Sequence, residues 1–199
     1  MTAGNRRPRM TLKVSLPGDQ SRIRQAILYV AKQCERAEHF GAIKLNKIIW
    51  KADFDSFAER GVPVTGREYR RQKFGPVLRE LVPVRREMLQ EGLIRIQRVR
   101  MGTDEKGRPI FEERAVVEGT PLISLLSAED KKFLDHSISH YWFMTGEESS
   151  DESHGVAWKT RSDGDPMPYE LSLLSDEPLP AKQLERIKHL IYERGWISE

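Results

Sequence analysis

The sequence predicts an α+β fold: a single, mostly α-helical domain built around a central helix, with one β-hairpin as a small antiparallel sheet. Residues 43–60 form a helical pattern with apolar side chains on two sides. Residues 93–117 contain two runs of alternating polarity around a polar loop, and further helical patterns lie before and after them. The chain has no internal repeat, and its 199 residues suffice for one domain with a substantial core.

The composition is that of a globular protein. With 38% hydrophobic and 32% charged residues, the chain is neither typical of a disordered protein nor of a membrane protein. No apolar run is long enough to cross a bilayer, and the basic N-terminus lacks the apolar region of a secretory signal. The single cysteine, Cys34, excludes an internal disulfide and fits a small core residue in a reducing, cytoplasmic setting.

The N-terminal part divides into a tail and a first helix. Residues 1–19 are rich in Arg, Gly and Pro without periodicity, so we expect a flexible basic tail, followed by the domain in residues 20–199. Ser21 is placed to cap the first helix, which should end near Phe40 and Gly41.

The central helix has two apolar stripes. One stripe consists of Leu45, Ile48, Ile49, Ala52 and Ser56, and the other of Trp50, Phe54 and Phe57. Two stripes predict contact with neighbours on both sides. Asp53 lies between them, so its carboxylate should be partly desolvated and must find a donor or a cation.

Glycine and proline divide the next segment. Residues 61–66 should form a turn, and Gly75 followed by Pro76 predicts a helix start with Pro76 in the first helical position. Pro83 should kink or divide this helix, which Gly92 ends.

The second half should hold a hairpin and three helices. Residues 93–101 and 109–117 predict the hairpin strands, and Ser127 with Asp130 resembles the capping box of a helix that runs through Phe143.

A further short helix should follow, with Ser149 or Ser150 as its cap. Residues 180–195 predict a final amphipathic helix.

Charge is distributed unevenly. Residues 67–100 have a net charge of +6 and residues 145–178 a net charge of −7. This asymmetry indicates one basic and one acidic surface, or simply two solvated faces.

The basic residues near the hairpin allow two interpretations. They are Arg70, Arg71, Lys73, Arg79, Arg95, Arg98 and Arg100. A helix pair followed by a basic hairpin could be a winged helix that binds nucleic acid. Interleaved glutamates and the low net charge argue against this, and a basic face that meets an acidic protein partner explains the same residues.

Two histidine patterns could carry chemistry. His136 and His140 have the spacing of a zinc pair, but no third ligand is evident and we expect no metal site. His154 shares a helix face with Trp158 and could act as a base with Asp53, or as the donor that satisfies its carboxylate; we favour the structural role. No phosphate loop or nucleophile elbow is present, so we expect neither a cofactor nor catalysis.

Four short motifs occur in order: KLNKIIWKADF from Lys44, GVPVTGREY from Gly61, KFGPV from Lys73 and SHGVAW from Ser153. Together they resemble the Panacea domain, also called the SocA-like antitoxin domain, over residues 21–174. The matching residues are Lys44, Leu45, Lys47, Trp50, Ala52, Asp53, Gly61, Pro63, Thr65, Gly66, Gly75, Pro76, Ser153, His154 and Trp158. Trp50 departs from the family, which more often has Tyr there.

This resemblance implies a bacterial or phage antitoxin that neutralises a cognate toxin by direct binding. In the SocA-like branch it also implies an adaptor that hands the toxin to a ClpXP-type protease, a route that we leave open here. Many relatives carry a separate DNA-binding domain, for which the short tail should leave no room. We expect the motif residues to specify the scaffold. The toxin should then contact the basic residues, the hairpin loop 102–108 or the acidic segment after Thr145.

Overall fold

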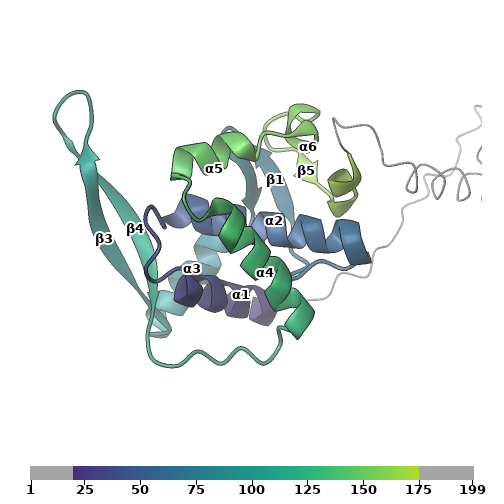
Figure 1. Ribbon diagram of the computed structural model, residues 1–199, viewed down its shortest axis with the longest axis horizontal. Coiled ribbons are helices and arrows are strands. Elements are labelled where there is room, and N and C mark those ends of the chain that lie inside the picture. The colour runs from purple at the N-terminus through teal and green to yellow at the C-terminus, as the bar shows by residue number, and fades with distance from the viewer. Residues whose placement is uncertain (1–19, 175–199) are drawn as a thin grey trace, which may run out of the picture.

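Helix α2, Ala42–Arg60, lies at the centre of the computed structural model (Figure 1). It packs against α1, Gln20–Gln33, and α4, Ala128–Tyr141. It also contacts α5, Gly146–Glu152, and the 3-10 helix η1, Tyr169–Leu173. The predicted central helix is therefore present, with elements from both halves of the chain around it.

Both apolar stripes of α2 are covered. The side chains of Leu45, Ile48, Ile49, Ala52, Phe54 and Ser56 are buried. Trp50 and Phe57 are partly buried against the same core. The helix ends at Gly61, whose φ of 75° is left-handed and whose N–H donates to the carbonyl oxygen of Phe57. The prediction of a two-sided helix is confirmed.

The strands form two small antiparallel sheets. β1, Tyr69–Gln72, pairs with β2, Gly75–Leu78, and with β5, Pro166–Met167, in the order β2-β1-β5. β3, Ile94–Thr103, pairs with β4, Pro109–Val117, in a separate hairpin that stands out from the helices at the left of Figure 1. The α+β class and the hairpin are confirmed, and the three-stranded sheet is an addition to the prediction.

The expected helix start at Gly75 and Pro76 is wrong. Both residues belong to β2, because Gly75 has a φ of 94° and closes a tight turn that pairs it with Gln72. Pro76 is tolerated there because β2 is an edge strand. Helix α3 begins at Leu81 and continues undivided to Gln90. Pro83 does not divide it, since it lies in the first turn, where N–H groups have no intrahelical acceptor.

The first helix ends earlier than expected. α1 stops at Gln33, and turns carry the chain to α2. Cys34, Ala37 and Phe40 in these turns are nevertheless buried. Their regular spacing continues the apolar pattern of α1, which explains why the sequence suggested a longer helix. Cys34 is the small core residue that was predicted.

The caps of the later helices are partly as predicted. Ser127 and Asp130 form the expected capping box of α4, although the helix ends at Tyr141 rather than Phe143. α5 is capped by Thr145 together with Glu148, and a separate short helix, α6, covers Val156–Lys159.

The predicted caps Ser149 and Ser150 are wrong, because both lie inside α5 and are buried. Their hydroxyls make other hydrogen bonds instead.

The structure describes residues 20–174. The expected basic tail, 1–19, and the expected final helix, 180–195, both lie outside this range. Within the described range, no helix has both the length and the apolar character needed to cross a bilayer.

Candidate functional site

Several polar side chains of α2 are buried and hydrogen-bonded to other parts of the chain. They include Lys44, Asn46, Lys47 and Asp53. The ammonium of Lys44 donates to the carbonyl oxygens of Glu38 and Trp142 at 3.1 and 3.0 Å. This ties the turn before α2 to the end of α4, so a single side chain fixes two loops.

Asn46 and Lys47 cover the free edge of β2. Asn46 donates to the carbonyl oxygen of Pro76 at 2.7 Å and accepts from the N–H of Leu78 at 2.9 Å. Lys47 donates to the carbonyl oxygens of Phe74 and Pro76 at 2.6 and 3.1 Å. These side chains take the place of a neighbouring strand, which an edge strand otherwise lacks.

Lys47 is an unusual residue to bury, with 1% of its surface exposed. Burial lowers the pKa of its ammonium to about 7, because desolvation disfavours the charged form, and Glu152 offsets this in part. Backbone carbonyl groups are its hydrogen-bond partners, so its role in the fold is to hold the β1–β2 turn.

Gly75 allows this close approach. A Cβ atom at Gly75 would overlap the hydroxyl of Ser153 and the ammonium of Lys47. Its positive φ also favours glycine. Three residues far apart in the sequence therefore meet at one backbone position.

The same turn is held from the other side. Ser150 of α5 donates to the carbonyl oxygen of Phe74 at 2.7 Å, and the indole of Trp158 donates to that of Gln72 at 2.8 Å. Residues of α5 and α6 are thereby joined to the β1–β2 turn.

Asp53 is fully buried and accepts hydrogen bonds from three residues, the longest from Tyr169. Thr65 donates with its N–H, at 2.5 Å, and with its hydroxyl, and Tyr69 donates its hydroxyl at 2.7 Å. The hydroxyl of Tyr169 lies 3.4 Å away but donates more closely, at 2.6 Å, to the carbonyl oxygen of Arg67. Burial raises the pKa of Asp53 to about 6, and these hydrogen bonds limit the rise.

The expected pairing of Asp53 with His154 is wrong. His154 stacks on Trp158 with ring centroids 3.9 Å apart, and its Nδ1 lies 3.9 Å from the carboxylate of Asp151. Desolvation, and then the positive charge of Lys47, lower the pKa of His154. The donors to Asp53 instead lie in the turn that follows its own helix, at Thr65, and at the start of β1, at Tyr69, because residues 61–66 fold back over α2.

Neither the catalytic pair Asp53–His154 nor the metal pair His136–His140 has geometric support in the described part of the chain. The buried carboxylate of Asp53 and the ring of His154 do not form a pair. His140 bonds to the carboxylate of Glu152 at 2.8 Å, and His136 lies 3.8 Å from that of Asp55. Residues 20–174 contain no group of three His, Cys, Asp or Glu side chains that could hold a metal ion.

The basic residues are not brought together as one strip. Arg70, Arg71 and Lys73 lie on β1 or its turn, whereas Arg95, Arg98 and Arg100 lie on β3 of the separate hairpin. Three of the seven basic residues already form ion pairs with carboxylates. Ion pairs join Arg71 to Asp163, Arg79 to Glu68 and Arg95 to Glu118. Paired charges attract phosphate weakly, which does not favour a nucleic-acid interface.

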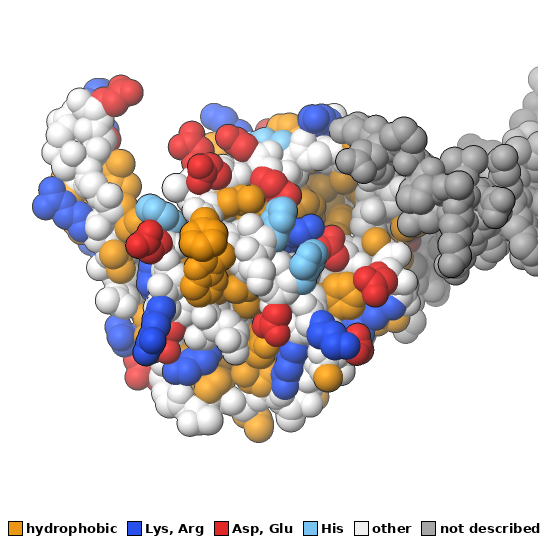
Figure 2. Space-filling model, viewed as in Figure 1, with side chains coloured by type: hydrophobic (Ala, Val, Ile, Leu, Met, Phe, Trp, Pro, Cys, Tyr) orange, Lys and Arg blue, Asp and Glu red, His pale blue; other side chains and the backbone are white. Residues whose placement is uncertain are grey.

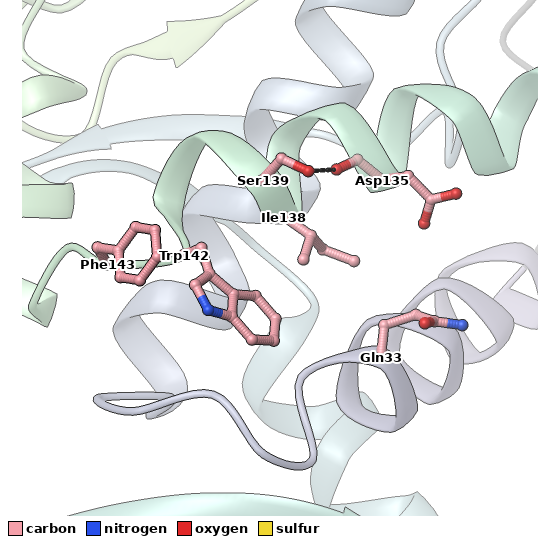
Figure 3. A pocket seen from close by; sticks show the side chains of 6 residues that line it. All are labelled: Gln33, Asp135, Ile138, Ser139, Trp142 and Phe143. Atoms are coloured by element: carbon pink, nitrogen blue, oxygen red, sulfur yellow. Dashed lines mark hydrogen bonds between the residues drawn. The ribbon is translucent and has the colours of Figure 1, made fainter.

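The structure has a surface hollow that the sequence analysis did not predict. It lies between the end of α1 and α4, has a volume of about 490 Å³, and includes Trp142 and Phe143 in its lining (Figure 3). The space-filling view shows hydrophobic side chains over the junction of α4 and α5 (Figure 2). The sequence had suggested a helix through Phe143, and its earlier end leaves that ring 89% exposed.

Comparison with family models gives one match. A model described as antitoxin SocA-like, Panacea domain, matches residues 45–159, which is more than half of the chain. The matched range runs from the first turn of α2 to the end of α6 and includes the β1–β2 turn with the side chains that hold it. No match was found among the curated proteins or the solved structures.

Proposed function

The chain belongs to the SocA-like antitoxin family with the Panacea domain, and from this premise we propose that it is the antitoxin of a toxin–antitoxin system. It neutralises a cognate toxin in the cytoplasm by direct protein–protein binding. It has no catalytic role of its own.

One observation carries the proposal beyond family membership. The buried polar side chains Lys47, Asn46 and Asp53 are bound to the protein's own backbone and hydroxyl groups. They stabilise turns and strand edges, so none is left to act on a substrate. This supports a scaffold whose function resides in its surface.

If the buried polar side chains serve only the fold, the toxin must bind to exposed side chains. The hairpin residues Arg98 and Arg100 are more available than Arg71 or Arg79, whose guanidinium groups are paired with carboxylates. We propose that the basic residues of the hairpin assist the encounter with the toxin, because unpaired surface charges mainly raise association rates.

The protein also acts, in this proposal, as an adaptor that delivers the toxin to a ClpXP-type protease. A masking antitoxin leaves the toxin's half-life unchanged, whereas an adaptor shortens it. Pulse-chase of the toxin with and without this chain, in cells with and without the protease, separates the two routes.

The central experiment is a rescue assay. The gene adjacent to this one is expressed alone and together with the chain. We expect growth arrest in the first case and rescue in the second, with co-purification of both proteins. Absence of toxicity or of rescue would contradict the antitoxin function, and salt-dependent binding to duplex DNA would instead favour a winged-helix regulator.

A further inference from the structure

The hollow beside α4 has the features of a protein-binding site. Its lining comes from the last turn of α1 and from the C-terminal half of α4 with the two residues beyond it (Figure 3). Those residues are Gln33, Asp135, Ile138, Ser139, Trp142 and Phe143. It is open to solvent. Small-molecule sites bury most of their ligand, so an open hollow suits a protruding part of a polypeptide better.

The aromatic wall is the first favourable feature. Phe143 is the most exposed large apolar side chain among the described residues. Trp142 is only partly buried, and within the described residues its carbonyl oxygen accepts from Lys44 while its indole N–H makes no hydrogen bond. A tryptophan that offers an apolar ring and a free donor is typical of interface residues that dominate binding energy.

The second favourable feature is the negative charge of Asp135, which lies at the end of the hollow away from Phe143 (Figure 3). One carboxylate oxygen of Asp135 accepts from the hydroxyl of Tyr29 at 2.8 Å, which fixes the side chain. In the described residues the other oxygen has no partner. α5 begins a few residues beyond Phe143 with Glu147 and Glu148, and acidic side chains lie above the hydrophobic patch in Figure 2. Acidic side chains therefore lie at two ends of the apolar surface, at Asp135 and beyond Phe143, while Lys and Arg side chains lie below it in Figure 2.

We propose that this hollow is the toxin-docking site, which rests on the antitoxin function proposed above. A toxin segment places an apolar side chain against Trp142 and Phe143, and a lysine or arginine of the same segment pairs with Asp135. A toxin carbonyl group accepts from the indole of Trp142. A symmetric second copy of this chain fits less well, because a two-fold axis would bring the acidic ends of the two surfaces against each other.

The test compares surface variants in the rescue assay and in binding to the purified product of the adjacent gene. Phe143→Ser removes the exposed ring, and Asp135→Asn removes the charge while it retains an acceptor for Tyr29. Phe74→Ser is the matched control, because Phe74 is 63% exposed on the β1–β2 turn and does not line the hollow. All three variants should keep the wild-type melting temperature.

We expect Phe143→Ser to weaken binding about 10-fold or more and to abolish rescue, while Phe74→Ser behaves as wild type. Asp135→Asn should weaken binding less and reduce its salt dependence, since it removes one ion pair. Wild-type binding by Phe143→Ser, or equal loss in Phe74→Ser, would overturn the proposal.

Three further outcomes are informative. If the wild-type chain itself neither binds nor rescues, the proposed function fails and the docking site fails with it. If wild type rescues but Phe143→Ser also rescues, only the docking site fails. A change in the oligomeric state of the isolated chain caused by Phe143→Ser would assign the hollow to self-association and would also overturn the proposal.

Discussion

The free edge of β2 and the edges of the β3–β4 hairpin meet the same physical problem with different solutions. An edge strand carries unpaired N–H and C=O groups. At β2 these groups are satisfied by Asn46 and Lys47 of α2. The hairpin consists of two strands in the described structure, and its base packs on α1 and α3 while its outer part exposes Ile110 and Phe111.

Residues around β2 and residues of the outer hairpin differ in how many other segments they contact. Around β2, each residue is fixed by partners from two or three other segments, so a substitution there disturbs several contacts at once. In the outer hairpin, contacts are made mostly across the two strands. The β2 region is therefore suited to specify a common scaffold, and the hairpin can vary without loss of the fold.

A substitution at Gly75 is expected to have the largest effect. The Cβ of Gly75→Ala would overlap Ser153 and Lys47 at a positive φ, so we expect a loss of about 4 kcal/mol or more in the free energy of unfolding. Gly107→Ala in the hairpin loop is the control, because its φ of 75° is also positive but no atom lies within 4 Å of the added Cβ. That change should cost only about 1 kcal/mol. Urea unfolding of both variants measures the difference, and equal losses would contradict it.

Removal of the buried carboxylate should follow in size. Asp53→Ala leaves the N–H and hydroxyl of Thr65 and the hydroxyl of Tyr69 without an acceptor, so we expect a loss of about 3 kcal/mol. Asp104 in the hairpin loop also accepts from backbone and side-chain donors, those of Lys106 and Arg108.

Water can replace the partly exposed carboxylate of Asp104, so Asp104→Ala should change the melting temperature little. If the two aspartates gave similar losses, burial would not be what makes Asp53 important.

The sequence predicted those features that depend on periodicity. The two stripes of α2 and the alternation of the hairpin follow from spacing alone, and both are present. The expected helix at Gly75 and Pro76 failed because glycine followed by proline suits a turn into an edge strand as well as a helix start. Local sequence cannot distinguish the two without knowledge of Lys47 and Ser153, which lie far along the chain in either direction.

The candidate site was predicted less well for the same reason. The burial of Asp53 follows from its place between two stripes, but its donors depend on how residues 61–66 return over the helix. The exposure of Phe143 depends on where α4 ends, which is the least certain property of a predicted helix.

The buried charges of α2 predict an unusual dependence of stability on pH. The pKa of Lys47 falls from 10.5 to about 7 on folding, so between pH 7 and 9 the folded protein binds fewer protons than the unfolded chain. Its contribution to the free energy of unfolding therefore rises with pH in this window. The pKa of Asp53 rises from 3.8 to about 6, so its contribution falls as pH increases from about 4 to 6.

Urea midpoints measured from pH 4 to 9 check both signs. Lys44 acts in the same direction as Lys47, because burial lowers its pKa too. The comparison is therefore wild type against Lys47→Met, which should reduce the rise between pH 7 and 9. Lys106→Met, in the exposed hairpin loop, should leave the curve unchanged. Identical slopes for wild type and Lys47→Met would show that Lys47 keeps its ordinary pKa in the folded protein.

The smallest effect is expected in the outer hairpin. The guanidinium of Arg98 lies 4.4 Å from the centre of the Phe111 ring, and the ring itself is partly exposed. Phe111→Ala removes this cation–π contact and little buried surface, so we expect a loss of about 1 kcal/mol or less in the free energy of unfolding. Hydrogen exchange should quicken at β3 and β4 beyond Arg98, while exchange at β1 and β2 stays as in wild type, because the two sheets share no strand. Faster exchange at both sheets would show that the hairpin supports the scaffold, and the contrast between the two edges would then be wrong.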